Sequence, residues 1–255
     1  MLALVALLVM VVPASAITDG ELDGNGHPYV GLMVAQDADG NPLWRCSGTL
    51  LSSKLFLTAG HCTESPAAHV KIWFDADVES GIPGNGYPFD GDVGGTPHTH
   101  PQYDPNAFYL FDLGAVVLDT PLEMEKYGKL PGLNSLDALK PRNSTRFTAV
   151  GYGLQRINPA MVTAERVRMV AYPHLIQINR GIVGDYSLLL SNNHSTGGTC
   201  FGDSGGPNFL GTSNVVAGVT SFGLNGTCGG TGGVYRVDRA DDLDWLNSQF
   251  GALLR

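Results

Sequence analysis

Short apolar segments separated by glycine- and proline-rich turns make up most of this sequence, and the pattern restricts the chain to a fold of short strands. The 255 residues include 34 glycines and 15 prolines, which interrupt helices and favour turns. The apolar or alternating segments are Gly31–Ala35, Cys46–Leu51, Leu55–Ala59, Val70–Phe74, Leu113–Leu118, Phe147–Gly151, Val167–Tyr172, Leu188–Leu190, Val215–Ser221 and Val234–Val237. Strands of this length and spacing are typical of a sandwich or a barrel, so we predict an all-β fold.

The predicted strands fall into two halves, joined by a connector rich in proline, glycine, lysine and asparagine at Pro121–Asn143. We therefore expect an N-terminal unit at about 17–125 and a C-terminal unit at about 140–238. Asp75–Pro101 contains so many glycines and prolines that we expect no regular element within it, and Asn192–Gly198 is predicted to be a second loop.

The end of the chain has a helical rather than a strand pattern. Leu243, Leu246 and Phe250 recur at the spacing of one helix face, after the acidic residues Asp241 and Asp242. Acidic side chains in the first turn favour the positive end of the helix dipole. We predict a short amphipathic helix at about 240–251 that closes a core.

The N-terminus has the pattern of a secretory signal peptide. Leu2–Val12 is an uninterrupted apolar run, and Ala14-Ser15-Ala16 follows as a typical cleavage site. The run is too short to span a membrane, which takes about 20 apolar residues. We expect cleavage after Ala16, a secreted mature chain at 17–255 that begins with Ile17, and no membrane contact after cleavage.

The charge balance argues against nucleic acid as a partner. The chain has 24 acidic residues against 15 Lys and Arg, a formal net charge of −9, and no run of basic residues. Binding to a phosphate backbone needs clustered cations, which this sequence lacks.

The four cysteines are consistent with export, because an even number in an exported chain indicates disulfides. Cys46 and Cys62 lie in the first half, and Cys200 and Cys228 lie in the second. Three pairings are possible, of which pairing within each half is the simplest. No cysteine or histidine spacing indicates zinc, so we expect no metal site.

A serine in a glycine-rich turn is the strongest chemical signal. Gly202–Pro207 reads GDSGGP, and its glycines allow a tight turn that leaves the Ser204 hydroxyl and the nearby N–H groups accessible. Part of this motif also matches the nucleophile elbow of α/β-hydrolases. Those enzymes place their catalytic histidine after the serine, whereas all seven histidines here precede Ser204, so the elbow is excluded.

A histidine and an aspartate that precede the serine are candidates for the general base and its partner. His61 follows the apolar strand Leu55–Ala59 and is held next to Cys62, which would fix its backbone. Asp112 begins the apolar run Leu113–Leu118, where a buried acid needs a partner such as a histidine N–H. We therefore predict a nucleophilic site with the chain order His61, Asp112, Ser204.

These motifs and their surroundings resemble the chymotrypsin/trypsin-like serine protease family. The matching segments span nearly the whole mature chain: Cys46–Leu50, Leu57–Cys62, Asp112–Gly114, Gly202–Pro207, Ser221–Gly223 and Gly233–Tyr235. The resemblance implies two packed six-stranded antiparallel β-barrels with catalytic residues in the cleft between them. It also implies the disulfides Cys46–Cys62 and Cys200–Cys228, protein or peptide substrates, a monomer and no cofactor.

The resemblance also implies a role for each site residue. Ser204 is the nucleophile, His61 the general base and Asp112 the residue that orients His61, while the N–H groups of Gly202 and Ser204 form the oxyanion hole. In the family, a new N-terminal amine pairs with the acid before the nucleophile. The corresponding activation pair is Ile17 and Asp203, although Ile17–Gly20 reads ITDG in place of the usual IVGG.

The same resemblance locates a specificity pocket. Its floor falls at Gly198, six residues before Ser204, where a trypsin-like enzyme has an aspartate that pairs with a basic substrate residue. The walls are expected from Cys200–Gly202 and Ser221–Gly223, so that the other expected pocket residues include Thr199, Phe201, Ser221, Phe222, Gly223 and Gly233. An uncharged, open pocket favours large apolar groups, so we expect cleavage after Phe, Tyr, Leu or Met.

Other interpretations of the sequence are less well supported by its residues. Some family members have lost catalysis and act as binding proteins, usually with a triad residue missing, whereas all three are present here. His98 and His100 are too few ligands to define a metal site, and loop acids that could hold calcium (Asp75, Asp77, Glu79, Asp90 and Asp92) are better explained as solvated. Asn143, Asn193 and Asn225 begin glycosylation sequons.

Overall fold

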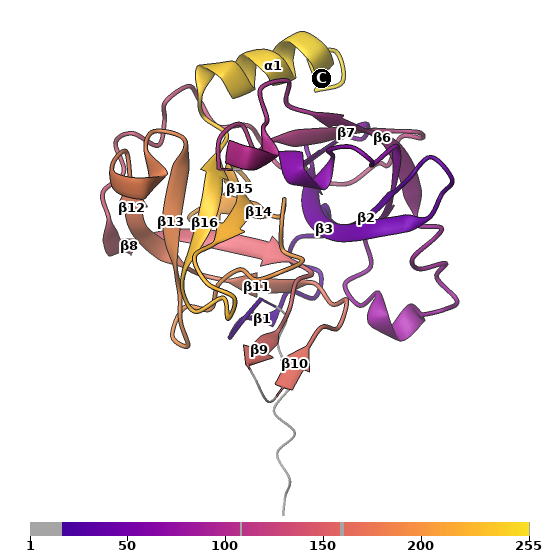
Figure 1. Ribbon diagram of the computed structural model, residues 1–255, viewed down its shortest axis with the longest axis horizontal. Helices are drawn as coiled ribbons and strands as arrows, with labels where there is room; N and C mark the ends of the chain where they lie inside the picture. Colours follow the sequence, from indigo (N-terminus) through magenta and orange to yellow (C-terminus); the bar gives the residue numbers. More distant parts are fainter. Residues whose placement is uncertain (1–16, 108, 159–160, 255) are drawn as a thin grey trace, which may run out of the picture.

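The apolar segments of the first half form antiparallel strands that close into a barrel, seen on the right of Figure 1. The computed structural model describes residues 17–107, 109–158 and 161–254, so the predicted signal peptide lies outside the described residues. The barrel order is β2-β3-β4-β7-β6-β5. Its strands are β2 (Val30–Gln36), β3 (Pro42–Leu50), β4 (Leu55–Thr58), β5 (His69–Trp73), β6 (Val93–Thr99) and β7 (Gly114–Leu118).

The second half forms another barrel, because β8 pairs with β14 at the far end of an antiparallel sheet of order β8-β12-β13-β16-β15-β14. The strands are β8 (Arg142–Gly151), β12 (His174–Ile178), β13 (Ser187–Asn192), β14 (Pro207–Leu210), β15 (Val216–Gly223) and β16 (Gly230–Arg236). Two further strands, β11 (Met169–Ala171) and β1 (Glu21–Leu22), extend the sheet beside β8. The prediction of two six-stranded barrels is confirmed.

The remaining elements are short. A hairpin of β9 (Arg156–Asn158) and β10 (Met161–Thr163) projects below the second barrel in Figure 1. Four 3-10 turns are η1 (Gly60–Cys62), η2 (Glu79–Gly81), η3 (Pro105–Ala107) and η4 (Gly181–Val183). The C-terminal helix α1 (Ala240–Phe250) covers the top of the molecule in the same view and buries Leu246 and Phe250, as its sequence pattern predicts.

The prediction that Asp75–Pro101 holds no regular element is wrong, because β6 lies within it and pairs with both β5 and β7. Its glycines are there for close packing rather than for a turn. A Cβ added at Gly95 would lie 2.5 Å from a Val116 side-chain atom and 2.8 Å from the Val117 carbonyl oxygen. Glycine in a strand often marks such a close approach, and a count of turn-forming residues cannot distinguish the two uses.

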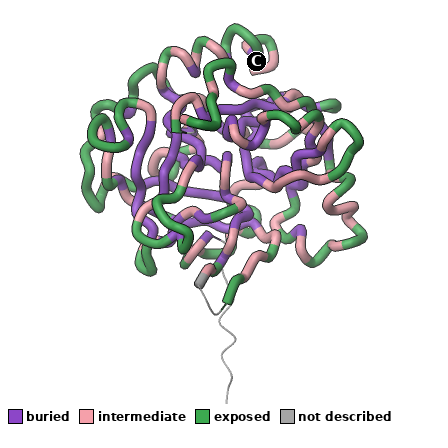
Figure 2. Tube along the Cα trace, viewed as in Figure 1, coloured by how far each residue is buried: buried purple, intermediate pink, exposed green. Residues whose placement is uncertain are grey.

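The first hydrophobic cluster runs through both barrels, and a second one fills the interior of the C-terminal barrel. Strand residues of the first barrel such as Leu32 and Trp73 belong to the same buried cluster as Phe209 and Tyr235 of the second. Figure 2 shows this arrangement as buried strands inside an exposed layer of loops. The two barrels are therefore packed against each other, and residues at their junction are held by both.

Candidate active site

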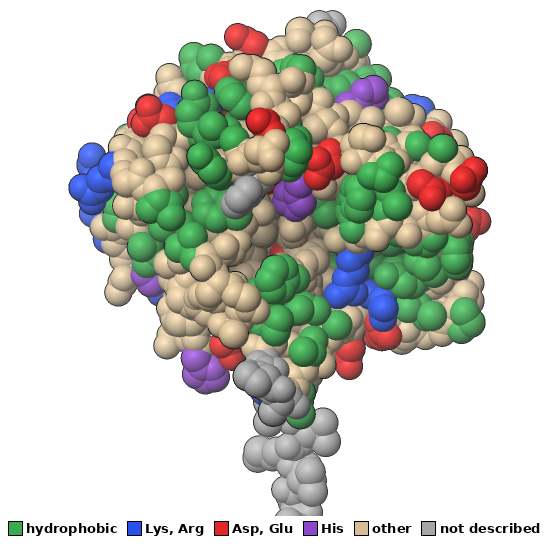
Figure 3. All heavy atoms as spheres, in the orientation of Figure 1, with side chains coloured by type: hydrophobic (Ala, Val, Ile, Leu, Met, Phe, Trp, Pro, Cys, Tyr) green, Lys and Arg blue, Asp and Glu red, His purple; other side chains and the backbone are tan. Residues whose placement is uncertain are grey.

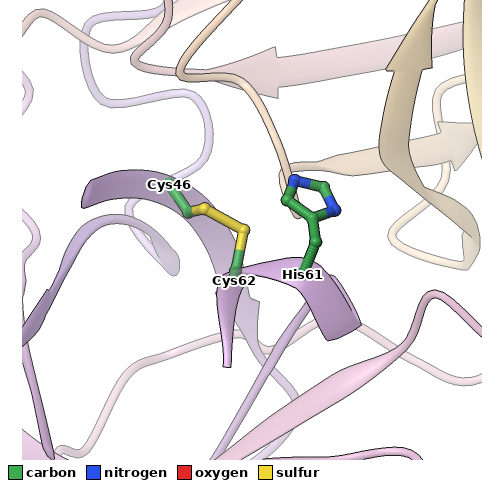
Figure 4. Close-up of side chains that lie close together, drawn as sticks. All are labelled: Cys46, His61 and Cys62. Carbon is green, nitrogen blue, oxygen red and sulfur yellow. A yellow bond between two sulfur atoms is a disulfide. The ribbon is translucent and has the colours of Figure 1, made fainter. Parts of the chain in front are cut away.

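The disulfide and a 3-10 turn together hold His61 at the edge of the first barrel. Cys46 on β3 is bonded to Cys62, the residue that follows His61 in η1 (Figure 4). The histidine ring points away from the disulfide in this view. These three side chains are close enough to suggest a metal group, but both sulfur atoms are oxidised to a disulfide and offer no thiolate ligand.

Asp112 lies just before β7, is fully buried and holds the histidine from behind. Its carboxylate accepts the His61 backbone N–H at 2.9 Å, and its Oδ2 lies 2.9 Å from the His61 Nδ1. The Ser221 hydroxyl, which comes from β15 of the second barrel, donates to the same oxygen at 2.5 Å. The buried charge is therefore satisfied by donors from both barrels.

This arrangement changes the basicity of the histidine. Burial lowers the pKa of His61, but the charge of Asp112, its hydrogen bond to the ring and the charge of Glu64 outweigh burial. The pKa of His61 is therefore raised above its ordinary value of 6.5. Because Nδ1 is engaged with Asp112, the other ring nitrogen, Nε2, is left for a proton acceptor role.

Ser204 sits in a tight turn between Gly202 and Gly205, whose φ angles are +93° and +76°. A Cβ at Gly205 would lie 2.0 Å from the Thr58 hydroxyl, so only glycine fits this position beside β4. Ser47 on β3 anchors the turn: its N–H donates to the Ser204 carbonyl at 2.8 Å and its hydroxyl to the Gly202 carbonyl at 3.0 Å.

The backbone N–H groups of Gly202 and Ser204 donate to no protein acceptor in the described part of the chain. Both flank the nucleophile candidate, and Gly202 and Ser204 are themselves partly exposed. Free N–H donors beside a serine hydroxyl are the arrangement that an oxyanion hole requires.

His61 and Ser204 line one cavity of about 310 Å³. Five of the predicted pocket residues, namely Thr199, Phe201, Ser221, Phe222 and Gly223, line it as well. Cys200, from the expected wall Cys200–Gly202, also lines it, whereas Thr220 and Cys228, the disulfide partner of Cys200, were not predicted as pocket residues. Both disulfides implied by the resemblance are present.

Two predicted pocket glycines are covered by other side chains. A Cβ on the buried Gly198 would lie 2.3 Å from Asn192, whose amide donates to the Thr199 carbonyl at 2.9 Å. A Cβ on Gly233 would lie 2.4 Å from the ring of Phe222. Neither glycine is among the residues that line the cavity.

Gly232 lies opposite the cavity-lining Gly223 on the neighbouring strand. An irregularity between Thr220 and Phe222 shifts the pairing of β15 and β16, so that Gly223 pairs with Gly232. A Cβ at Gly232 would lie 2.9 Å from the Thr199 hydroxyl, which lines the cavity. No sequence signal locates such an irregularity.

The two residues of the predicted activation pair are both buried. Ile17 is 0% exposed among Met169 and Ala171, and the next residue, Thr18, forms a β-bridge with Gly198. Asp203 is also 0% exposed.

The Asp203 carboxylate accepts the N–H groups of Gly153 at 2.8 Å and Cys200 at 2.9 Å. Burial raises the pKa of Asp203 to about 7, although these N–H groups and the charge of Arg45 oppose the shift.

The remaining histidines and acids of the sequence analysis have other partners. His98 packs on Phe250, and His100 is 2% exposed and lies against Trp245, so both contact the C-terminal helix. The loop acids each have a different partner. Asp90 forms an ion pair with Lys71, and Glu79 forms one with Arg166. Asp77 accepts a hydrogen bond from the Ser80 N–H, and Asp92 accepts one from the Phe74 N–H.

On the face that Figure 3 shows, acidic and basic side chains are scattered and form no broad basic area. Among the described residues, no helix is long and apolar enough to cross a membrane.

Two packed six-stranded barrels with His, Asp and Ser side chains at their junction define the chymotrypsin-like fold class, and comparison with known proteins agrees. The family model described as Trypsin matches residues 23–245. The chain therefore belongs to the trypsin family.

Two relatives match over most of their length. Brachyurin from Leptuca pugilator is 29% identical over 241 residues, which cover 89% of this chain and 95% of that protein. Collagenase from Hypoderma lineatum is 25% identical over 274 residues, which cover 94% of this chain and 92% of that protein.

Solved structures show the same fold. The structure described as HL collagenase has a TM-score of 0.73 and 24% identity, and covers 92% of this chain and 99% of its own. Human heparin binding protein has a TM-score of 0.70 and 21% identity, with 92% of this chain and 97% of its own covered. At these identities the likeness concerns the fold alone.

Proposed function

We propose that this chain is a secreted serine endopeptidase that uses His61, Asp112 and Ser204 as its catalytic residues. The observation that carries the proposal is the junction of the two barrels, where the Asp112-bound His61 and Ser204 line one cavity. Its relatives of the trypsin family support a hydrolase of the chymotrypsin type. A protein or peptide is the substrate class that this site suits.

The mechanism follows the general scheme for serine proteases. The Ser204 hydroxyl attacks the scissile carbonyl carbon while His61 Nε2 takes its proton. Asp112 holds the ring and stabilises the imidazolium. The tetrahedral intermediate collapses when His61 returns the proton to the leaving amine, and water then releases the acyl group from Ser204 by the same steps.

The N–H groups of Gly202 and Ser204 are the proposed donors to the oxyanion of both intermediates. Loss of one such donor in a serine protease costs about 2.7–4 kcal/mol of transition-state stabilisation. Since both N–H groups lack a protein acceptor in the described part of the chain, they can bind the oxyanion without breaking an existing bond.

We propose a preference for large apolar residues before the scissile bond. Among the described residues no acidic side chain lines the cavity, so a substrate Lys or Arg would be buried there without a counter-charge. The aromatic ring of Phe222 and the disulfide of Cys200 and Cys228 offer apolar contact instead. Matched peptides that end in Phe, Leu, Arg or Ala before the scissile bond test this. A preference for Arg of about tenfold, or 1.4 kcal/mol, would overturn it.

We further propose that removal of residues 1–16 both accompanies secretion and activates the enzyme. The freed amine of Ile17 would pair with Asp203, a buried carboxylate that has N–H donors but no ion-pair partner among the described residues. Pairing removes the penalty of a lone buried charge. N-terminal sequencing of active, secreted protein should start at Ile17, and an active form that starts elsewhere would contradict this step.

A fluorophosphonate probe that reacts with activated serines tests the enzyme itself. The mature wild-type protein should become labelled, and Ser204→Ala should not. Ser213→Ala is a matched control, because this exposed serine belongs to a distant surface turn before β15 and its loss should leave labelling unchanged. A folded wild-type protein that takes up no label would favour the alternative of an inactive homologue that acts as a binding protein.

A further inference from the structure

The residue before Asp112 has an unusual backbone conformation. Phe111 has a φ angle of +53°, a region that bulky side chains rarely adopt, and the Leu113 N–H donates to its carbonyl at 2.8 Å. This tight turn is what directs the Asp112 carboxylate inward to His61. Strained conformations of this kind persist only where surrounding contacts hold them.

Two aromatic contacts hold Phe111, one from each barrel. His100 stacks on it with ring centroids 5.3 Å apart and planes inclined by 7°. Tyr186, from the segment before β13 of the second barrel, packs against it at 5.5 Å and 58°. Phe111 is therefore held between the two barrels.

His100 is itself fixed in place. It is 2% exposed, and its backbone N–H donates to the Leu113 carbonyl at 2.9 Å. The Trp245 ring of α1 packs edge-on against the His100 ring, with ring centroids 5.0 Å apart. Its Nδ1 accepts the Gln102 N–H, and its Nε2 lies 4.0 Å from the buried Asp242 carboxylate. The C-terminal helix thus supports the ring on which Phe111 stacks.

We propose that Phe111 is a positioning residue of the active site. Its ring packs against His100 and Tyr186, and these contacts hold the turn that orients the Asp112 carboxylate towards His61. The inference rests on the proposed function only where it concerns the effect of Phe111 on the rate of catalysis. Its effect on His61 can be measured in protein that does no catalysis.

The test is a titration of the His61 ring by NMR in the mature protein and in Phe111→Ala. Asp112 raises the pKa of His61, so a displaced carboxylate should lower that pKa towards 6.5, the ordinary value. Glu64 is the other charge that acts on His61 and is unchanged in this variant. In the active enzyme, kcat should fall by about 10–100-fold with little change in KM, because the geometry of the base is lost rather than substrate binding.

Conservative variants separate positioning from stability. His100→Phe keeps an aromatic ring against Phe111 and should leave the pKa of His61 and kcat within about twofold of wild type, whereas His100→Ala should lower both. Phe89→Ala is the control, because this ring is 60% exposed and lies outside the site.

Two results would overturn the proposal. The first is an unchanged pKa of His61 in both Phe111→Ala and His100→Ala. The second is a decrease of the His61 pKa and of kcat that is equally large in His100→Phe and His100→Ala. If Phe111→Ala does not fold, the His100 pair decides alone. A wild-type protein without fluorophosphonate labelling would refute the proposed function, while the His61 titration would still decide this inference.

Discussion

Arg168 joins the two barrels through a fully buried guanidinium, and its removal gives the sharpest stability prediction. Its Nε donates to the Asp23 carboxylate at 3.0 Å, and both side chains are 1% exposed. Its other nitrogens donate to the carbonyls of Gly24 at 2.7 Å, Phe74 at 2.9 Å and Val30 at 3.1 Å, and to the Tyr152 hydroxyl at 3.1 Å. Phe74 and Val30 belong to the first barrel, whereas Tyr152 follows β8 of the second.

Arg168→Met keeps most of the apolar stem but leaves Asp23 buried with His27 as its remaining partner. Breaking one member of a buried ion pair costs about 3–5 kcal/mol, and the orphaned carbonyls do not reduce that cost. For a domain of this size, each kcal/mol lowers Tm by about 2–4 °C, so we expect a decrease of about 6–20 °C. Thermal unfolding followed by circular dichroism, with disulfides intact, measures it.

The double variant Asp23→Asn, Arg168→Met tests the cause. If the cost comes from a stranded carboxylate, the neutral amide should recover about half of the loss or more, because replacing both charges is much milder than removing one. A loss in Arg168→Met below about 1 kcal/mol, or no recovery in the double variant, would show that the guanidinium does not hold the barrels together in this way.

Three further predictions concern the site. The general base must be neutral, so kcat/KM should fall as the pH drops through the pKa of His61, and the midpoint should lie above 6.5; a midpoint below that value would contradict the role of Asp112. Gly223→Val should reduce cleavage after Phe by about 10–200-fold by filling the cavity, whereas Gly226→Ala, which has open space around it, should not, as parallel peptide kinetics would reveal. Ser221→Ala removes a donor to Asp112 and should lower kcat by about tenfold while it leaves Tm within a few degrees; an unchanged kcat would show that the bond is dispensable.

The sequence predicts the strands that are apolar and interrupted by clear turns, but not those whose residues have a second use. Strand β6 was missed because Gly94, Gly95 and Pro97 resemble turn residues, although the barrel needs small residues there. Strands β12 and β14 were also missed, since β12 alternates poorly and β14 begins at Pro207, inside the serine motif. Their place is set by pairing with distant strands, which local pattern does not contain.

For the site, short motifs were enough to select His61, Asp112 and Ser204, because glycine and cysteine neighbours mark each of them in the chain. The arrangement of the pocket residues depends instead on the pairing register of β15 and β16. The shift that pairs Gly223 with Gly232 comes from an irregularity in β15, which no residue type announces. The burial of Arg168 could not be predicted either, because arginine is usually exposed and the sequence does not show which backbone carbonyls will accept its hydrogen bonds.

The two barrels supply different parts of the proposed active site. His61, which lines the cavity, and the buried Asp112 behind it come from the first barrel, whereas Ser204 and the other described residues that line the cavity come from the second. Hydrogen bonds connect the two parts: the Ser221 hydroxyl donates to Asp112, and the N–H and hydroxyl of Ser47 on β3 donate to the carbonyls of Ser204 and Gly202. The nucleophile is therefore aligned with its base only while the barrels stay packed. Because Ser221 lines the cavity and also donates to Asp112, the pocket and the proposed base are coupled at this residue, and we expect a substitution there to act on both.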